Sequence, residues 1–259
     1  MKKIVLVGDL HGIPELLERI PRSRIAAVVV AGIRGHEHEQ LLKLADLSGL
    51  PLIVQPRKTS AEYANFQSSI SRLRPDGLIC HSYSMLIQKE ILDLVEGRAF
   101  NVHMALLPRN RGPNPVQWAL IHGESQTGVT LHLMDETFDA GPLIAQESTE
   151  IGITDTWVTL SLKLKALTKQ LLDRALPDIL SGNWTAVRQN EAEATSNSRI
   201  SKDSFAIDFA VMDDLQIYNL IRAQVAPLAG AYLQTAAGRQ HFSELISIEQ
   251  IAQMRCRDE

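Results

Sequence analysis

Residues 100–143 read FNVHMALLPRNRGPNPVQWALIHGESQTGVTLHLMDETFDAGPL, and this stretch decides the fold that we expect for the whole chain. It opens with the end of an apolar strand, predicted over residues 99–103, and returns as a second, alternating strand at 127–134. Between the two strands lie a loop rich in proline and arginine and a predicted helix at residues 115–122. A plain scaffold segment does not need so many polar side chains.

Three of these polar side chains are expected to share one site. Asn101 and His103 are two residues apart on a strand, so both point to the same side, and the sharp turn at Asp139 brings a carboxylate back. An Asn amide can donate to an oxygen that gains negative charge, and a His passes protons near neutral pH. The combination suits acyl transfer to nitrogen. Taken singly, each residue also fits a structural part: a strand-end cap, a core histidine and a turn residue.

Strands and helices alternate through the first hundred residues. Apolar runs predict strands at residues 4–7, 26–30, 52–54, 78–80 and 99–103, and helical spacing separates them. Alternation of this kind predicts an α/β fold with a doubly wound, mostly parallel sheet, whose ligands bind outside the carboxyl ends of the strands.

The second half of the chain predicts a smaller appended part. We expect a catalytic core over residues 1–190, a linker or exposed loop at 191–206 and a small C-terminal subdomain at 207–259. A long helix is predicted within 154–180 and a shorter one at 213–225.

Composition excludes several classes of protein. The 259 residues are 45% hydrophobic and 22% charged, which is ordinary for a soluble globular protein. The net charge of −4 gives no general attraction to nucleic acid or an anionic membrane, and no apolar run reaches the length of a membrane span. Two distant cysteines, Cys80 and Cys256, indicate neither a disulfide framework nor a zinc site, and they fit a reducing cytoplasm.

Two other motifs suggest metal binding. Gly8-Asp9-Leu10-His11-Gly12 matches the opening ligand pair of binuclear metallophosphoesterases, but the further ligand runs that two metal ions need are missing, and a tight strand-to-helix turn is the simpler interpretation. His36-Glu37-His38 also has two potential ligands, although such histidines at a helix start are usually exposed polar residues. We therefore predict no metal site. A dinucleotide fingerprint is absent as well.

The central stretch resembles the formyltransferases that use 10-formyltetrahydrofolate. The matching elements, in chain order, are Asn101 and His103, Leu106-Leu107-Pro108, Arg111-Gly112-Pro113-Asn114-Pro115, Gly123-Glu124, Thr127-Gly128-Val129-Thr130 and Asp139-Ala140-Gly141. Weaker similarity extends over most of the first 190 residues. The resemblance implies a catalytic trio of Asn101, His103 and Asp139. It implies a folate pocket lined by Met85, Leu86, Ile87, Met134, Asp135, Glu136, Thr137 and Phe138.

The acceptor is predicted from the C-terminal part. Residues 207–232 resemble the start of the C-terminal domain of methionyl-tRNA formyltransferases, but too little chain follows for that full domain. From Ser201 onward the chain has five basic and eight acidic residues, a net charge of 5 − 8 = −3. A negative segment is a poor match for the phosphates of tRNA. The compact length instead resembles the sugar N-formyltransferases. These act on nucleotide-linked 4-amino-4,6-dideoxy sugars, of the GDP-perosamine or dTDP-4-amino-4,6-dideoxyglucose type, for lipopolysaccharide O-antigen or other surface polysaccharide.

The sugar reading adds residues and partners. It implies contacts to the acceptor from Tyr83, Arg109, Asn110, Arg111 and Trp118, and by resemblance a homodimer. The two arginines also fit a loop that merely covers its own surface. Three alternatives stay open: a formyltransferase for methionyl-tRNA or for a siderophore or peptide amine, a metal-dependent phosphoesterase, and a non-catalytic folate- or nucleotide-binding relative.

Overall fold

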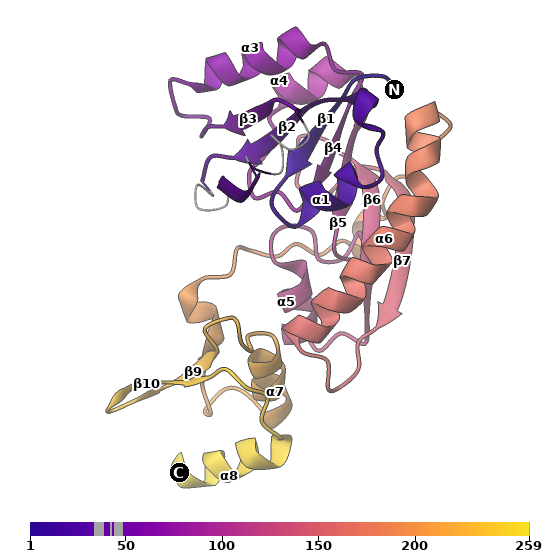
Figure 1. Cartoon of the computed structure of the whole chain (residues 1–259). Coiled ribbons are helices and arrows are strands. Elements are labelled where there is room, and N and C mark those ends of the chain that lie inside the picture. Colours follow the sequence, from indigo (N-terminus) through magenta and orange to yellow (C-terminus); the bar gives the residue numbers. More distant parts are fainter. Residues whose placement is uncertain (34–38, 42, 44–48, 259) are drawn as a thin grey trace. The chain divides into compact units, whose positions relative to one another are not determined.

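The structure, a computed structural model, describes residues 1–33, 39–41, 43 and 49–258, and its centre is a seven-stranded sheet (Figure 1). The strand order is β3-β2-β1-β4-β5-β6-β7. Neighbours from β3 to β5 pair in parallel, and β6 runs antiparallel to β5. The mostly parallel α/β sheet predicted from the sequence is therefore confirmed. The strands are β1 Ile4–Gly8, β2 Ile25–Ala31, β3 Leu52–Gln55, β4 Gly77–His81, β5 Ala99–His103, β6 Gln126–Leu133 and β7 Leu143–Glu150.

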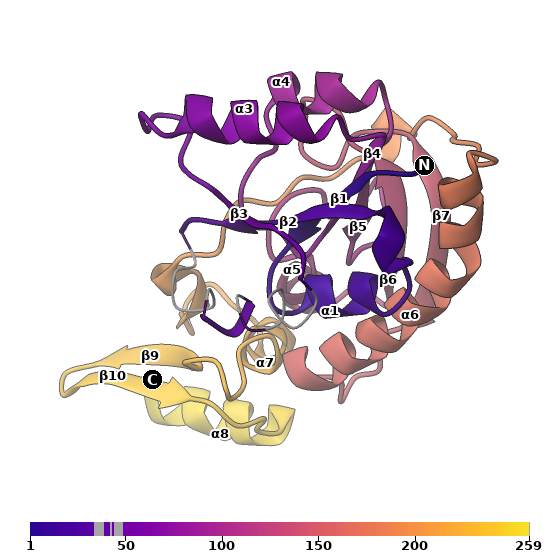
Figure 2. The same ribbon diagram turned by 45° about the horizontal axis from the view of Figure 1, so that its top comes forward.

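Both faces of the inner strands are buried, which explains their uninterrupted apolar sequences. Every residue of β1 and β4 is buried, because helices cover both sides of the sheet. Helices α3 (Tyr63–Leu73) and α4 (Lys89–Leu92) lie together on one side and α1 (Gly12–Leu17) on the other (Figure 2). Phe66 and Ile70 of α3 belong to the core cluster under β1 and β4.

The chain divides into two compact units. The first comprises residues 1–103, 129–146 and 168–192, and the second comprises residues 104–128, 147–167 and 193–259. The long helix α6 (Trp157–Ser181) supplies residues to both. The boundaries expected from the sequence, with a core ending at residue 190, stay a prediction.

The second unit contains the small C-terminal elements. Helix α7 (Asp214–Arg222) confirms the helix predicted over residues 213–225, and it ends in a buried Arg222 whose guanidinium donates to the carbonyls of Gly152 and Ile153 at 3.0 and 3.3 Å. The other elements of this unit are α5 Pro115–Ile121, β8 Ala206–Ile207, β9 Ala231–Thr235, β10 Gly238–Phe242 and α8 Ile248–Asp258. Short 3-10 turns occur at Arg22–Arg24, Asp93–Val95, Glu191–Glu193 and Lys202–Phe205. Within the described residues, no helix combines the length and the apolar character needed to cross a membrane.

Candidate active site

Asp139 lies between the two side chains with which it was predicted to work. Its Oδ1 accepts a hydrogen bond from Asn101 Nδ2 at 3.1 Å, and its Oδ2 lies 3.5 Å from His103 Nδ1. Strand β5 provides Asn101 and His103 from its carboxyl end, and Asp139 comes from the turn between β6 and β7. The structure therefore brings together the three groups that the sequence placed in one site.

A fourth polar side chain, His132, completes this cluster and was not predicted. It lies opposite Asn101 in the register of β5 and β6, and its Nε2 is 3.1 Å from Asn101 Nδ2 and 3.4 Å from Asp139 Oδ1. Its Nδ1 is 2.7 Å from the carbonyl oxygen of Leu133, which can only accept, so Nδ1 carries the proton. In the neutral ring Nε2 then accepts from Asn101. A lone histidine in the apolar strand at 127–134 was the available signal.

This arrangement defines the orientation of the Asn101 amide. The two hydrogens on Nδ2 point to Asp139 Oδ1 and to His132 Nε2. Donation to a substrate oxygen therefore requires one of these two contacts to be exchanged. The cluster is well shielded, since the side chains of His103 and Asp139 are 8% and 11% exposed. Charge–dipole interactions are stronger in such a site than in water.

The buried thiol of Cys80 lies near the same carboxylate but takes no part in the chemistry that we infer. Burial raises the pKa of Cys80, and the negative charges of Asp139 and Asp9 raise it further. The thiolate is the nucleophilic form of cysteine. Cys80 therefore stays a neutral thiol, and Asn101, His103 and Asp139 remain the candidate reacting groups.

The first predicted folate segment, residues 85–87, is held by Gln55 at the end of β3. Gln55 is buried, donates to the carbonyl of Leu86 at 3.0 Å and accepts from the hydroxyl of Tyr83 at 2.9 Å. Met85 and Leu86 are half-buried, whereas the side chain of Ile87 is in the core. Burial raises the pKa of Tyr83, so its hydroxyl stays protonated and acts as a donor. Gln55 was not singled out in the sequence.

The second predicted folate segment is close to the first. Met134 packs on the same core cluster as Tyr83, and Glu136 Oε1 lies 3.3 Å from Lys89 Nζ in helix α4. Asp135, Glu136, Thr137 and Phe138 are all exposed, and Phe138 keeps 57% of its surface accessible. An exposed aromatic ring such as that of Phe138 is a surface that a flat ligand can cover.

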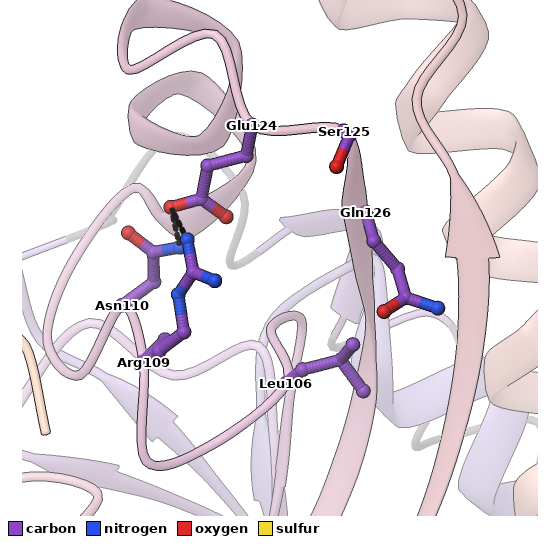
Figure 3. Close-up of a pocket in the computed structure, with 6 residues that line it drawn as sticks. All are labelled: Leu106, Arg109, Asn110, Glu124, Ser125 and Gln126. Atoms are coloured by element: carbon purple, nitrogen blue, oxygen red, sulfur yellow. Dashed lines mark hydrogen bonds and ion pairs between the residues drawn. The ribbon is translucent and has the colours of Figure 1, made fainter. Parts of the chain in front are cut away.

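In the second unit, the loop expected to bind the acceptor lines a small cavity (Figure 3). Glu124 lies at its centre, accepting from Asn110 Nδ2 at 2.9 Å and lying 3.4 Å from Arg109. The cavity, about 130 Å³, is lined by Leu106, Arg109, Asn110, Glu124, Ser125 and Gln126. Arg109 is 57% exposed, so it is the part of this loop that a ligand can reach.

Asn110, by contrast, is occupied within the protein. It is buried in the left-handed conformation, with φ 59°, and besides Glu124 its side chain accepts from Asn197 Nδ2 at 2.6 Å. Its backbone N–H donates to Thr195 Oγ1 at 2.8 Å. This network joins the loop to residues 195–197. The predicted contact from Asn110 to an acceptor stays a prediction, and the observed contacts support the loop itself.

The two remaining predicted acceptor contacts also have partners in the second unit. Arg111 is buried. Its backbone N–H donates to the carbonyl of Thr195, and its carbonyl accepts from the N–H of Asn197, both at 2.9 Å. Trp118 on α5 donates from its indole nitrogen to the carbonyl of Ser198 at 3.0 Å and stacks on His122. The Leu107-Pro108 peptide bond is cis.

The Gly8-Asp9-Leu10-His11-Gly12 motif, one of the two sequences that suggested metal binding, forms a backbone turn. Asp9 Oδ1 accepts from the backbone N–H groups of His11 and Gly12, at 2.9 and 3.2 Å, which is a tight turn at the start of α1. No group of three or more metal-ligating side chains occurs among the described residues. The His36-Glu37-His38 motif lies outside them.

Comparison with known proteins gives a family match over most of the chain. Residues 1–176 match the sequence profile of the family described as Formyl transferase. Similar solved structures include a 4-N formyltransferase from Francisella tularensis, at 20% identity and TM-score 0.77, with 95% of this chain and 98% of that chain covered. A sugar N-formyltransferase from Shewanella sp. has 19% identity and TM-score 0.76, with 95% and 100% covered.

A third similar structure was solved with ligands. It is an N-formyltransferase from Helicobacter canadensis in complex with folinic acid and dTDP-3-aminofucose, at 18% identity and TM-score 0.65, with 86% of this chain and 80% of that chain covered. At such identities the likeness establishes the fold.

Proposed function

This chain belongs to the formyl transferase family, and we propose that it moves the formyl group of 10-formyltetrahydrofolate to the amino group of a nucleotide-linked amino sugar. The family predicted from residues 101–141 is thereby confirmed. The observation that carries the activity is the convergence of Asn101, His103 and Asp139 at the carboxyl end of β5.

The proposed reaction is an acyl transfer between two nitrogens. The lone pair of the acceptor amine attacks the formyl carbon, and the electrons of the C=O bond move onto oxygen. When the tetrahedral centre collapses, the bond to N10 of the folate breaks, N10 takes a proton and the acceptor nitrogen loses one. Tetrahydrofolate and the formamido product leave.

Each residue of the cluster has a part in this scheme. Asn101 and protonated His103 donate to the developing oxyanion, a contribution of about 3–4 kcal/mol for one donor in a comparable acyl-transfer site. Asp139 lies 3.5 Å from His103 Nδ1, where it orients the imidazole ring and directs the opposite ring nitrogen to the substrate. The Asp139 carboxylate also carries the proton from the attacking amine to N10 of the folate.

Support for the folate donor comes from the two segments around Tyr83. The half-buried Met85, Leu86 and Met134, together with the exposed Phe138, form an apolar surface next to polar backbone. Such mixed surfaces bind flat heteroaromatic rings. The similar Helicobacter canadensis protein was solved with folinic acid, a formylated tetrahydrofolate.

Support for an amino-sugar acceptor comes from the neighbours and from charge. Similar proteins are named sugar N-formyltransferases, and one was solved with dTDP-3-aminofucose. We propose a 4-amino-4,6-dideoxy sugar linked to GDP or dTDP, with Arg109, Arg111, Trp118 and Tyr83 as candidate contacts. The net charge of 5 − 8 = −3 from Ser201 onward argues against tRNA as the acceptor.

The wider setting is proposed on the same basis. A product formamido sugar suits lipopolysaccharide O-antigen or another surface polysaccharide. The two free cysteines are compatible with the reducing cytoplasm, where nucleotide sugars and reduced folates are made. We also propose a homodimer, which light scattering of the purified protein would test.

One assay tests the proposed activity. The protein is incubated with 10-formyltetrahydrofolate and a panel of GDP- and dTDP-linked amino sugars, and tetrahydrofolate release is followed together with the mass of the product. We expect a gain of one formyl group on one member of the panel. Release only with methionyl-tRNA or a peptide amine would replace the sugar by that acceptor. Activity that depends on a divalent metal and frees phosphate would overturn the assignment.

A further inference from the structure

The turn that carries Asp139 has a backbone conformation that depends on its surroundings. Asp139 has φ 55°, in the left-handed region that side chains with a Cβ rarely adopt. Two residues on, Gly141 lies so close to the end of β6 that a Cβ there would overlap the carbonyl oxygen of Leu133. A backbone in this conformation persists only when the surrounding structure holds it.

Gln189 supplies the missing support from a distant part of the sequence. Its side chain is buried, and its Nε2 donates to the carbonyl of Asp139 at 2.8 Å and to the carbonyl of Gly141 at 2.7 Å. A side-chain amide has two N–H donors, and here both are directed at the one turn. The two hydrogen bonds hold the peptide group that directly follows the left-handed residue and the one that follows Gly141.

The segment that carries Gln189 is itself anchored in the first unit. Trp184 packs edge-on against Phe100, with ring centroids 5.4 Å apart, and Phe100 is fully buried next to Asn101. Val187 forms two backbone hydrogen bonds of 2.8 Å with Leu143, the first residue of β7. Gln189 is therefore a fixed point for the turn, because the residues just before it are tied to β5 and to the start of β7.

We propose that Gln189 is a positioning residue of the formyl transfer reaction, which acts by holding the Asp139 turn so that the carboxylate faces His103 and Asn101. This inference rests on the proposed function for its catalytic part. Without the two donors, the carbonyls of Asp139 and Gly141 lose their side-chain partner, and the turn relaxes away from its left-handed conformation. The carboxylate then leaves the position 3.1 Å from Asn101 Nδ2.

The test uses the full chain and two matched variants. Gln189→Met keeps the length and volume of the side chain and removes both donors. Arg188→Met places the same residue type one position earlier, where the side chain is exposed. For each protein we would measure the melting temperature, hydrogen–deuterium exchange over residues 133–143, and kcat and KM for both substrates.

Positioning makes a specific set of predictions. In Gln189→Met, exchange over residues 133–143 is expected to accelerate about tenfold. The value of kcat should fall about 10²-fold, the loss that a misplacement of 1 Å can cause, while both KM values stay within about twofold. The double variant Asp139→Asn/Gln189→Met should be no slower than Asp139→Asn alone, because the two changes remove one function. Arg188→Met should behave like the wild type.

The outcomes separate this inference from the proposed function. Unchanged exchange over residues 133–143 in Gln189→Met would overturn the inference, whatever the activity. Faster exchange with an unchanged kcat, or losses that add in the double variant, would limit Gln189 to a purely structural part and also overturn it. A wild-type protein that transfers no formyl group to any acceptor would overturn the proposed function, and the exchange measurement would still decide whether Gln189 holds the turn.

Discussion

The carboxylate of Asp139 and the imidazole of His103 face each other, with Oδ2 3.5 Å from Nδ1 and both side chains nearly buried. A carboxylate at this distance can hold the imidazole ring in one orientation. The reaction that we propose needs a donor at the oxyanion and a carrier for one proton. We propose that this pair provides both functions.

Removing the charge of Asp139 should stop most of the reaction. Asp139→Asn keeps the shape of the side chain, but it leaves His103 without its counter-charge and the proton without a carrier. We expect kcat to fall about 10²- to 10⁴-fold, the range of general acid–base catalysis, with little change in the KM for the folate. Tetrahydrofolate release measures the effect. Asp178→Asn, an exposed position on α6, is the control, and a variant that retained wild-type kcat would contradict the role of Asp139.

His132 should act through Asn101. Replacement by Phe removes the acceptor at 3.1 Å from Asn101 Nδ2 and the donor to the carbonyl of Leu133, so the amide loses its fixed orientation. We expect kcat to decrease about tenfold, an effect of one hydrogen bond. Because both residues serve one function, Asn101→Ala/His132→Phe should be about as slow as Asn101→Ala. Additive losses in the double variant would show that His132 has an independent part.

Gln55 should affect the binding of the folate more than the binding of the acceptor. Gln55→Met removes the donor to Leu86 and the acceptor from Tyr83, which frees the segment expected to line the pterin pocket. Two hydrogen bonds of about 1 kcal/mol each predict a KM for 10-formyltetrahydrofolate that rises about tenfold or more. The KM for the nucleotide sugar should rise by a smaller factor, because Tyr83 is only one of its candidate contacts, and Gln67→Met on α3 serves as control. An equal increase in both KM values would mean a general loss of structure.

Arg109 and its neighbour Asn110 should separate binding from stability. Arg109 is 57% exposed, and its guanidinium forms an ion pair with Glu124 at 3.4 Å. Because exposed ion pairs contribute little, Arg109→Gln should change the free energy of unfolding by no more than about 0.5 kcal/mol. If the guanidinium contacts the diphosphate, the KM for the nucleotide sugar should increase about tenfold. Arg72→Gln on α3 is the matched control. An unchanged KM would assign Arg109 to the loop surface alone.

Asn110→Ala should show the opposite pattern. The change removes the buried Asn110 amide, to which Glu124 and Asn197 are hydrogen-bonded. It also places an alanine at φ 59°. Leaving buried polar groups without a partner costs about 1–3 kcal/mol in the free energy of unfolding. Thermal unfolding should therefore shift to lower temperature, with the KM of the folded enzyme preserved. Full thermal stability of Asn110→Ala would contradict the role of this network.

The pH dependence of stability should have a contribution from Asp155, before the start of α6. Burial opposes its ionisation, but the hydrogen bonds from Lys163, the Gly152 N–H and Thr159 prevail and lower the pKa of Asp155. Because the pKa of Asp155 is lower in the folded than in the unfolded protein, its ionised form stabilises the fold at pH values above the unfolded-state pKa of about 3.9. This stabilisation is lost as the pH falls through the folded-state pKa. Asp155→Asn should thus be less stable than the wild type at pH 7 and approach it below about pH 3.9 in urea unfolding. A difference that is constant with pH would exclude this linkage.

The sequence predicted those elements whose signal is local. The inner strands β1, β2 and β4 are largely apolar runs between turns, because both of their faces are buried. Strand β7, LIAQESTE, was not predicted, since its residues are half-buried or exposed and it has no apolar run. The hairpin of β9 and β10 was missed for the same reason, because every residue of β10 except Phe242 is exposed.

Site residues follow the same distinction. Asn101, His103 and Asp139 lie in one recognisable motif, so the sequence could place them together. Gln189 lies 50 residues beyond Asp139 and Gln55 lies 31 residues before Leu86, and each acts on backbone atoms. A residue that recognises a carbonyl oxygen leaves no pattern of side chains to detect. Asn110 is predicted from the sequence to contact the acceptor, and its partners Glu124 and Asn197, which the sequence did not predict, connect it to the loop.

The anchoring of the Asp139 turn by Gln189 also limits how short a working version of this enzyme can be. The region that matches the family profile ends at residue 176, and it already contains all the groups that we expect to meet the substrates. A fragment cut at that point would lack Trp184, Val187 and Gln189. It would keep every candidate reacting side chain, but the turn that carries Asp139 would lose its support. Deletion series and domain grafts made from this protein should therefore retain the chain to at least residue 189.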